Sequence, residues 1–579
     1  KKMLITILLL TLLLLIIIGI IIKRRLTPKI SKNLFKEKTK DPEKESDFDV
    51  KRVYSQKKLN ASRSYDVIII GSGMSGLTCA ALIAKSGKSV LVLEQHDILG
   101  GCLHTFEENG YEMDTGLHYI GGMKEGATSR VLLDSLTNGR LKFHQMGDIF
   151  DQVVIGEKER HNLYGDPSKF KEALLRDFPK EKEGILAFIQ ALERVRKSNM
   201  GYHILKFFPM LQPVLAFFGV GKTFLGYSKK TVVEVFDECQ IRDPHLRTTL
   251  GYIYGDYGTI PSQAPFTMHA VVLNHYVSSG SYYPVGGPQR MVRELVGSIR
   301  AYQGELFTMA RVASIETKKK KVTGVRMVRD GVFISANTVI SSAGLLNTFG
   351  SLVRNKKLTK GLLKPYATPG IAHFCVYMGF NCSLSLPSHN TWWVPSVSME
   401  QHYLDWMRAP SFSDSLQLPG LFLSFPSAKD PTWSSRYPNK SVGLAICTVP
   451  YHWFAPFEKF RVKQRGGEYM ALKLAIQDLV LSQVYSLFPS LKSHLDYVDS
   501  SSPLSTSFYL NSVQGASYGI HFSSSRELDL SLSPSTPIDG LLLTGQDILC
   551  PGVIAALISG VLTCSSFFNR DMMGDLSSL

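Results

Sequence analysis

Residues 65–76 read YDVIIIGSGMSG, an apolar run that leads directly into three glycines at fixed spacing. The run predicts a buried strand, and the residues after it predict a helix over 73–86. Gly71 permits a tight turn, Gly73 lets a pyrophosphate approach the backbone, and Gly76 lets the helix pack on the strand. The N-terminus of such a helix offers free N–H groups and partial positive charge to phosphates. The stretch therefore predicts a dinucleotide-binding βαβ unit.

A second predicted strand, over 89–94 (SVLVLE), ends in Glu94. The carboxylate is placed to accept hydrogen bonds from ribose hydroxyls, and its charge would repel a 2′-phosphate, so NADP is disfavoured at this site. Gly100 and Gly101 follow closely and suit a loop that closes over the pyrophosphate. Three turn glycines alone would leave the position of Glu94 unexplained, and we therefore favour dinucleotide binding.

The composition fits a folded enzyme of two or more domains, with 579 residues, 44% of them hydrophobic and 20% charged. The net charge of +16 is concentrated at the start of the chain, where residues 1–60 hold 15 Lys/Arg against 6 Asp/Glu. No basic array with interleaved aromatic residues follows, so we expect no nucleic-acid partner. The eight cysteines lack metal-type spacing, so we expect buried thiols and no metal site.

The N-terminal segment contains a run of 19 uncharged, mostly aliphatic residues, Leu4 to Ile22. Such a run crosses most of a hydrocarbon core about 30 Å thick. Because it ends in Lys23-Arg24-Arg25 and not in a small-residue cleavage site, we expect residues 1–25 to be a membrane anchor, with a cleaved signal as the alternative. The basic residues after it favour a cytosolic body. Residues 26–62 predict a basic linker.

The rest of the chain shows alternating helix and strand patterns, with turns at the Lys318–Lys321 run and at Asp330-Gly331. No internal repeat is visible. The patterns predict mainly helices over 125–260, strands over 281–345 and 370–450, an amphipathic helix over 468–489, and a tail with a strand from 541 and a hydrophobic helix over 553–568.

Several stretches resemble a known superfamily. GSGMSG (71–76), LEQHDILGG (93–101) and DTGLHYIGG (114–122) resemble the FAD-dependent amine oxidases and phytoene desaturases. The resemblance is closer still to the retinol saturase family within it, and covers about residues 65–570. The stretches that carry this closer resemblance are TMHAVVLNHY (267–276), YYPVGG (282–287), FPSAKDPTW (425–433) and LTGQDI (543–548). The first three motifs are shared widely, whereas FPSAKDPTW is far more particular.

The resemblance implies an α/β fold with a Rossmann-like FAD-binding domain of the GR2 type, an interleaved α+β substrate domain, and an N-terminal hydrophobic helix. The FAD-binding domain would comprise residues 63–130, 281–350 and 536–579. The substrate domain, which faces the membrane in its first part, would comprise 131–280 and 351–535. The resemblance also implies residence in the endoplasmic reticulum membrane.

The resemblance also assigns positions to the cofactor. ILCPG (548–552) stands where many related flavoproteins carry more glycines. The residues that would hold FAD are Gly71, Gly73, Ser75 and Gly76 at the pyrophosphate, Glu94 at the adenosine ribose, Gly100 and Gly101 in the closing loop, Val312 at the adenine, Gly545 and Asp547 near the ribityl and phosphate groups, and Val553 near the flavin pyrimidine.

The activity that the resemblance implies is saturation of the 13–14 double bond of all-trans-retinol by hydride and proton addition. A carotenoid desaturase or isomerase is one alternative, and a flavin-bound retinoid carrier without turnover is another. Only one dinucleotide fingerprint is present, so NAD or NADP would visit the flavin transiently, or another protein would be the electron donor.

The proton donor is not evident from a motif. His118 in DTGLHY is a candidate because an imidazole can donate near neutral pH, with a structural histidine as the alternative. We rank Tyr119, His269, His275 and Tyr518 below it.

Residues 200–226 are rich in Phe, Leu and Pro and are interrupted by Pro209 and Pro213. One hypothesis is a core segment of the substrate domain. The other is a hairpin that dips into lipid headgroups and opens a tunnel for retinol.

Overall fold

The computed structural model describes residues 32–38, 40, 50–59, 64–207, 211–363, 366 and 368–579. The predicted anchor at 1–25 lies outside these residues. Within the described part of the chain, no helix combines the length and the apolar character that a membrane span requires.

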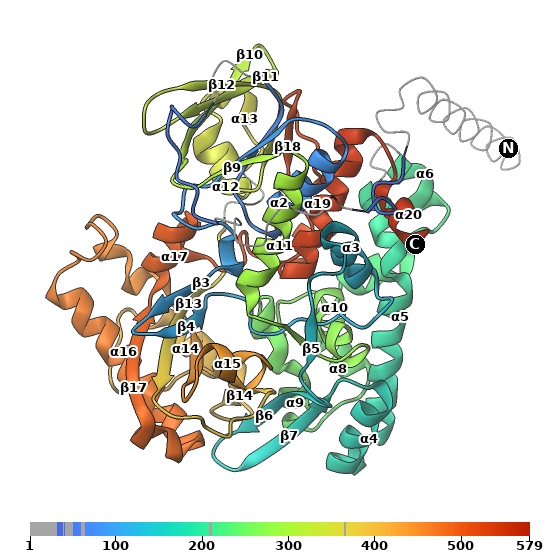
Figure 1. Cartoon of the computed structure of the whole chain (residues 1–579). Coiled ribbons are helices and arrows are strands. Elements are labelled where there is room, and N and C mark those ends of the chain that lie inside the picture. The colour runs from blue at the N-terminus through green and yellow to red at the C-terminus, as the bar shows by residue number, and fades with distance from the viewer. Residues whose placement is uncertain are drawn as a thin grey trace, which may run out of the picture.

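The first sheet has seven strands and is parallel at its centre (Figure 1). The path runs β10-β11-β12-β1-β2-β9, and β18 pairs with the C-terminal end of β12. The strands are β1 (Tyr65–Ile70), β2 (Val90–Leu93), β9 (Glu305–Phe307), β10 (Val312–Lys318), β11 (Lys321–Met327), β12 (Phe333–Ser341) and β18 (Leu541–Leu543).

Strand β1 is apolar from Val67 to Ile70 because both faces of this sheet are covered there. Val67 and Ile69 pack on one side against α2 (Met74–Lys85), α11 (Pro288–Ala301) and α19 (Val553–Phe568). The alternate residues of β1 pack on the other side, in the core that includes the β10–β12 strands. The predicted strand-helix-strand unit is confirmed, as are the helix over 553–568 and both predicted turns.

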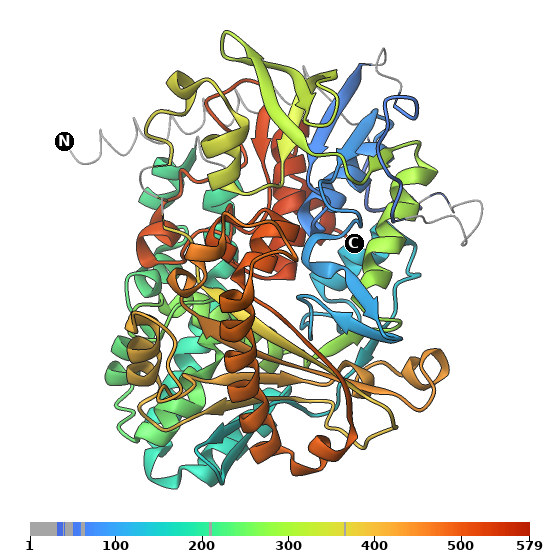
Figure 2. The same ribbon diagram turned by 90° about the vertical axis from the view of Figure 1, so that its left-hand side faces the viewer.

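The second sheet also has seven strands, in the order β17-β13-β16-β15-β14-β6-β7, and all its pairs are antiparallel except β14 with β6. It lies below the first sheet in Figure 1, and Figure 2 shows the same two layers from the side. The strands are β6 (Ile149–Ile155), β7 (Glu159–Tyr164), β13 (Ala372–Phe380), β14 (Asn390–Val394), β15 (Leu421–Ser424), β16 (Ser441–Val449) and β17 (Leu495–Ser501).

Two secondary-structure predictions are wrong in part. The stretch 125–260, predicted as mainly helical, contains β5 (Phe143–Gln145), β6 and β7. Strand β6 reads IFDQVVI and lacks polar-apolar alternation, because most of its residues on both faces are buried. The stretch 281–345, predicted as strands, contains the 14-residue helix α11, which Pro288 starts at its first position.

Helices cover the second sheet on the side of β6 and β7. The long α5 (Lys182–Phe207) runs along one edge of the molecule in Figure 1. It packs against α10 (Phe266–Val277) and α7 (Lys222–Ser228). The helix predicted over 468–489 is α16 (Gly467–Leu487).

The described part of the predicted basic linker, 26–62, is packed against the first sheet and does not behave as a solvated linker. Leu34, Phe35, Tyr54 and Leu59 are buried. The Tyr54 backbone N–H donates to the carbonyl oxygen of Thr308, at 2.8 Å. This basic segment therefore also contains apolar side chains that pack in the core of the domain.

Replacing Tyr54 with Ala tests that packing. The fully buried ring meets Phe307 edge-on at 6.0 Å between centroids. Losing an aromatic ring from a core costs about 3–5 kcal/mol, so we expect a clearly lower melting temperature. The control is Val53→Ala, at a side chain that is 40% exposed. Equal melting temperatures for the two variants would contradict the packed arrangement.

Candidate active site

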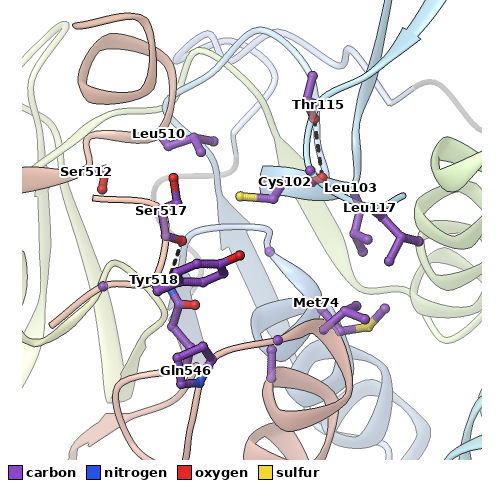
Figure 3. Close-up of a pocket in the computed structure, with 18 of the residues that line it drawn as sticks. Met74, Cys102, Leu103, Thr115, Leu117, Leu510, Ser512, Ser517, Tyr518 and Gln546 are labelled. Carbon is purple, nitrogen blue, oxygen red and sulfur yellow. Dashed lines mark hydrogen bonds between the residues drawn. The ribbon is translucent and has the colours of Figure 1, made fainter. Parts of the chain in front are cut away.

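A cavity of about 1920 Å³ lies between the two sheets. Single-ligand pockets are typically about 300–1,000 Å³, so this space has room for a large cofactor together with a substrate. Figure 3 shows part of its wall, where Met74, Leu117, Tyr518 and Gln546 surround the space. All the residues predicted to hold FAD line this cavity except Gly76, which packs the helix behind it.

Two helix N-termini face the cavity without caps. Helix α2 begins after Gly73, and α19 begins after Gly552. Neither N-terminus has a side-chain cap or an acidic residue in its first turn. Their first backbone N–H groups therefore need an acceptor from outside the helix, and two partial positive charges converge on one space. This arrangement fits the diphosphate of a dinucleotide.

The three glycines between β1 and α2 each meet a different structural requirement. Gly71 has φ of +94°, which side chains rarely adopt. A Cβ at Gly76 would overlap the carbonyl oxygen of Gly71, so close packing of α2 on β1 requires its absence. A Cβ at Gly73 would meet only the Ser342 hydroxyl, at 4.0 Å, so the fold leaves space there for a ligand. Ser75 follows in the first turn and bonds the same hydroxyl, at 3.0 Å.

Glu94 lies at the predicted ribose position and is held rigidly. Its Oε2 accepts from the backbone N–H and the hydroxyl of Ser72, at 2.9 and 2.7 Å. Its Oε1 accepts from the His96 backbone N–H, at 2.9 Å, and retains a lone pair for a ribose hydroxyl. The Ser72 hydroxyl in turn accepts from the N–H of Gly100. The carboxylate therefore couples the glycine turn to the closing loop.

Asp547 has a structural role that the sequence did not predict. Its Oδ2 accepts from the N–H of Leu345, at 2.7 Å, and its Oδ1 accepts from the N–H of Ile520, at 3.1 Å. Gly519 approaches it so closely that a Cβ there would overlap Oδ1. Asp547 thus ties three separate chain segments together, and its contact with a ribityl group stays a prediction.

The other predicted cofactor residues surround the same space. Val312 begins β10 and lines the cavity, and its contact with the adenine stays a prediction. Gly101 has φ of +56°, and a Cβ on it would lie 3.1 Å from the Cα of Gly73, so the closing loop touches the glycine turn. Gly545 has φ of +114°, and Val553 opens α19.

Four of the eight cysteines differ from the expectation of buried thiols, because Cys375, Cys382 and Cys550 are only partly buried and Cys102 is exposed. All eight are free, and Cys102 is exposed because its side chain faces the cavity (Figure 3). Among the described residues, no cluster of His, Cys, Asp or Glu is suited to a metal ion.

His118 lies on the cavity wall as a neutral imidazole. Burial, assisted by the charge of Lys429, lowers the pKa of His118 to about 3. Its Nδ1 is buried without a hydrogen-bond partner in the described part of the chain. A neutral imidazole releases its proton poorly, so this environment disfavours the predicted role as proton donor.

Three of the four lower-ranked candidates line the cavity, and all four make fixed hydrogen bonds. Tyr119 and Tyr518 have hydroxyls that bond Asp256 and the Gly255 carbonyl respectively. His275 accepts from the Gly121 N–H through Nε2, at 2.9 Å. His269 does not line the cavity and bonds the Tyr257 hydroxyl.

The motif FPSAKDPTW places a buried ammonium beneath the cavity wall. The Lys429 Nζ donates to the His118 carbonyl oxygen, at 2.7 Å, to the Ser424 hydroxyl, at 2.6 Å, and to the Asn390 side-chain oxygen. Burial lowers the pKa of Lys429 to about 7. Its hydrogen bonds join the loop after β15 to the DTGLHY segment.

The far end of the cavity is aromatic and contains a carboxyl group that sequence reasoning missed. Tyr276 stacks on Tyr119 at 4.3 Å, and Trp392 meets Phe422 edge-on at 4.7 Å. Among these rings lies Asp256, from GYIYGDYG (251–258). The sequence signal that could have identified Asp256 is its position as a single acidic residue within an aromatic and glycine-rich stretch.

The comparisons with known proteins agree with this geometry. The model of the NAD(P)-binding Rossmann-like domain family matches residues 69–136. All-trans-retinol 13,14-reductase of Homo sapiens is 34% identical, over 89% of this chain and 87% of its own. This chain belongs to the all-trans-retinol 13,14-reductase family.

Members and relatives of the family differ in chemistry. An inactive all-trans-retinol 13,14-reductase of Danio rerio is 27% identical, over 88% of this chain and 87% of its own. A chloroplastic prolycopene isomerase of Daucus carota is also 27% identical, over 87% of this chain and 80% of its own.

The solved structures support the fold prediction. Putrescine oxidase aligns with a TM-score of 0.54 and 16% identity, over 88% of this chain and 100% of its own. An oxidoreductase of Methanosarcina mazei aligns with a TM-score of 0.54 and 15% identity, over 87% of this chain and 100% of its own. The predicted α/β Rossmann-like fold is confirmed.

Alanine at Gly73 and at Gly76 should have separable effects. Gly73 has φ of −63°, which alanine adopts freely, so Gly73→Ala should melt like wild type in the flavin-free state. Its methyl group would occupy the space facing the phosphates, so we expect FAD affinity to fall at least about tenfold, or 1.4 kcal/mol. Gly76→Ala should lower the melting temperature itself.

Flavin fluorescence titration and thermal melts of the flavin-free proteins measure the two effects. Wild-type FAD affinity in Gly73→Ala would show that the phosphates do not lie against this turn.

Proposed function

We propose that this chain is an FAD-dependent oxidoreductase that saturates the 13–14 double bond of all-trans-retinol. One observation carries the proposal beyond family membership: a single cavity joins two uncapped helix N-termini to an aromatic chamber. The first end fits a dinucleotide diphosphate, and the second fits a flat, apolar polyene.

The chain's own residues would bind and orient both partners. The turn at Gly71 and Gly73 and the first turn of α19 would hold the diphosphate, and Glu94 would hold the ribose. A bound flavin supplies a hydride to a carbon centre through its ring N5. Tyr276, Trp392 and the other rings of the chamber would align the polyene and exclude water, which an unpolarised double bond requires.

The electron donor is proposed as a nicotinamide nucleotide, NAD or NADP, that visits the flavin, or as a separate redox protein. The glycine turn and Glu94 form one dinucleotide site, which the proposal assigns to FAD. The carboxylate of Glu94 would disfavour a 2′-phosphate at that position. The proposal therefore needs no second nucleotide domain.

A polyene isomerase or desaturase is the second candidate, favoured by the likeness to prolycopene isomerase. Both chemistries would use the same aromatic chamber. They differ in electron count, because saturation consumes a reducing equivalent and isomerisation does not.

We further propose that the protein docks on the endoplasmic reticulum membrane near α6 (Gln212–Phe217). Phe217 and Phe218 are 67% and 51% exposed. Met200, on the adjacent α5, is 58% exposed and also lines the cavity, so the cavity opens beside these rings. In the same segment Tyr202 and Phe224 are buried, so it combines core packing with an apolar surface.

Anaerobic incubation of the photoreduced holoenzyme with all-trans-retinol tests the activity. We expect the flavin absorbance near 450 nm to return on mixing. We also expect one equivalent of a product two mass units heavier than retinol, identified by mass spectrometry. A product of unchanged mass would favour isomerisation, and no reoxidation would favour a carrier without turnover.

Serine at Phe217 and Phe218 tests membrane docking. Because burying an aromatic side chain contributes about 1.5–3 kcal/mol, we expect the double variant of protein lacking residues 1–25 to bind liposomes at least tenfold more weakly. Co-sedimentation measures this. The control is Phe333→Ser, an exposed ring at the start of β12 that is 39% exposed. Equal binding by both variants would count against docking at α6.

A further inference from the structure

The buried carboxyl group of Asp151 and the partly buried one of Asp256 meet one phenol at the aromatic end of the cavity. The Tyr119 hydroxyl oxygen lies 2.7 Å from Oδ2 of Asp256 and 3.2 Å from Oδ2 of Asp151. A phenol has one proton and donates one strong hydrogen bond at a time. With both carboxylates ionised, one of the two contacts would place oxygen lone pairs against each other. The geometry therefore calls for one additional proton in this cluster.

The hydrogen bonds around Asp151 assign the negative charge to it. It accepts from the Tyr252 hydroxyl, at 2.7 Å, from the Asn390 amide, at 2.9 Å, and from the Trp392 indole N–H, at 3.1 Å. Three fixed donors stabilise the ionised form of a carboxyl group. In the part of the chain that the structure describes, the side chains that hydrogen-bond to Asp256 are the phenols of Tyr119 and Tyr276. The additional proton consequently belongs on Asp256, which donates to Tyr119 while Tyr119 donates to Asp151.

Asp256 is the member of the carboxyl pair that faces the cavity. Its neighbour Gly255 accepts from the Tyr518 hydroxyl, at 2.8 Å. Figure 3 shows Tyr518 beside Gln546 on the wall near α19, where the flavin ring is proposed to lie. Asp256 is thereby fixed to the same wall as the proposed hydride source, whereas Asp151 is sealed behind the rings of Tyr252 and Trp392.

The electrostatics agree with a proton held near neutral pH. Burial raises the pKa of Asp256 to about 7. Burial and the neighbouring Asp256 also raise the pKa of Asp151, so the pair titrates together and shares a proton across the neutral range, and the hydrogen-bond donors around Asp151 place that proton on Asp256. The groups that face the pair from the surrounding elements are Tyr119, Tyr252, Tyr257, Tyr276, Tyr518 and the Lys429 ammonium behind Asn390.

We propose that Asp256 is the catalytic acid of the reduction and that Tyr119 and Asp151 are positioning residues that keep its carboxyl group protonated. The inference rests on the proposed function. A hydride with both electrons, supplied by reduced flavin, forms a C–H bond at one alkene carbon. The O–H bond of Asp256 breaks, and its proton forms a C–H bond at the other carbon.

Asp256 is left as a carboxylate, and the Tyr119 hydroxyl can then turn to donate to it. A proton from water restores the acid before the next turnover. The atoms balance as one alkene, one hydride and one proton giving one saturated bond.

The test is single-turnover reoxidation of the photoreduced holoenzyme, with Asp256→Asn compared with wild type. General acids typically contribute 10²–10⁴-fold, so we expect reoxidation by retinol to slow by at least about a hundredfold. Reoxidation by ferricyanide needs no proton transfer to carbon and should be unchanged. The wild-type rate should be level below about pH 7 and fall above it, since the acid form is lost as pH rises, and the variant should lose this dependence.

Three further variants separate catalysis from folding. Asp114→Asn is the matched control, because Asp114 is buried, bonds one tyrosine hydroxyl and lies outside the cavity lining. Its retinol rate and pH profile should match wild type. Asp256→Glu keeps a carboxyl group and should retain more activity than Asp256→Asn. Tyr119→Phe should move the midpoint of the pH profile while leaving flavin binding intact.

A wild-type rate and pH profile in Asp256→Asn would overturn the inference, as would equal losses with retinol and with ferricyanide. If the wild-type protein itself fails to reduce retinol, the proposed function fails, and the assignment of the acid falls with it for that separate reason.

Discussion

The close approach of α2 to β1 is the constraint on which the site depends. Because Gly76 has no side chain, the helix lies directly against the carbonyl of Gly71, and its N-terminus points into the cavity. The unmet backbone N–H groups of that turn favour an anion, and α19 adds a second such turn. A side chain at Gly76 would push α2 off the sheet and move both turns apart, because α2 and α19 pack in one core.

The opposite end of the cavity depends on how polar groups are buried among aromatic rings. A buried charge is tolerated only when several hydrogen bonds compensate its lost hydration. Lys429 has three acceptors, and Asp151 has three fixed donors in addition to Tyr119. These two charges are joined through Asn390, which accepts from one and donates to the other. The chamber can therefore remain dry and apolar toward a polyene while it holds one exchangeable proton.

The cofactor end was predictable from the sequence because its residues are close together in the chain. The strand, the three glycines and Glu94 form one βαβ unit, and each signal in it is local. The linker prediction failed because Tyr54 and Leu59 find their partners in distant strands such as β9. Strand β6 was missed because its partner β14 comes more than 200 residues later, and α11 was missed because the flanking strands dominated the pattern.

The reaction end could not be predicted, because its groups come from separate parts of the chain. Tyr119, Asp151, Asp256 and Asn390 belong to four segments that only the assembled second sheet and its helices bring together. Tyr119 alone stands in a motif, DTGLHY, where it ranked below its neighbour His118, and the other three have none. Relatives that align with most of the chain nevertheless include a reductase, an isomerase and an inactive protein. We infer that the chemistry is decided at the carboxyl groups and rings around the substrate. A proton on Asp256, together with a hydride from reduced flavin, would let the protein add hydrogen to a polyene, whereas binding the polyene requires neither.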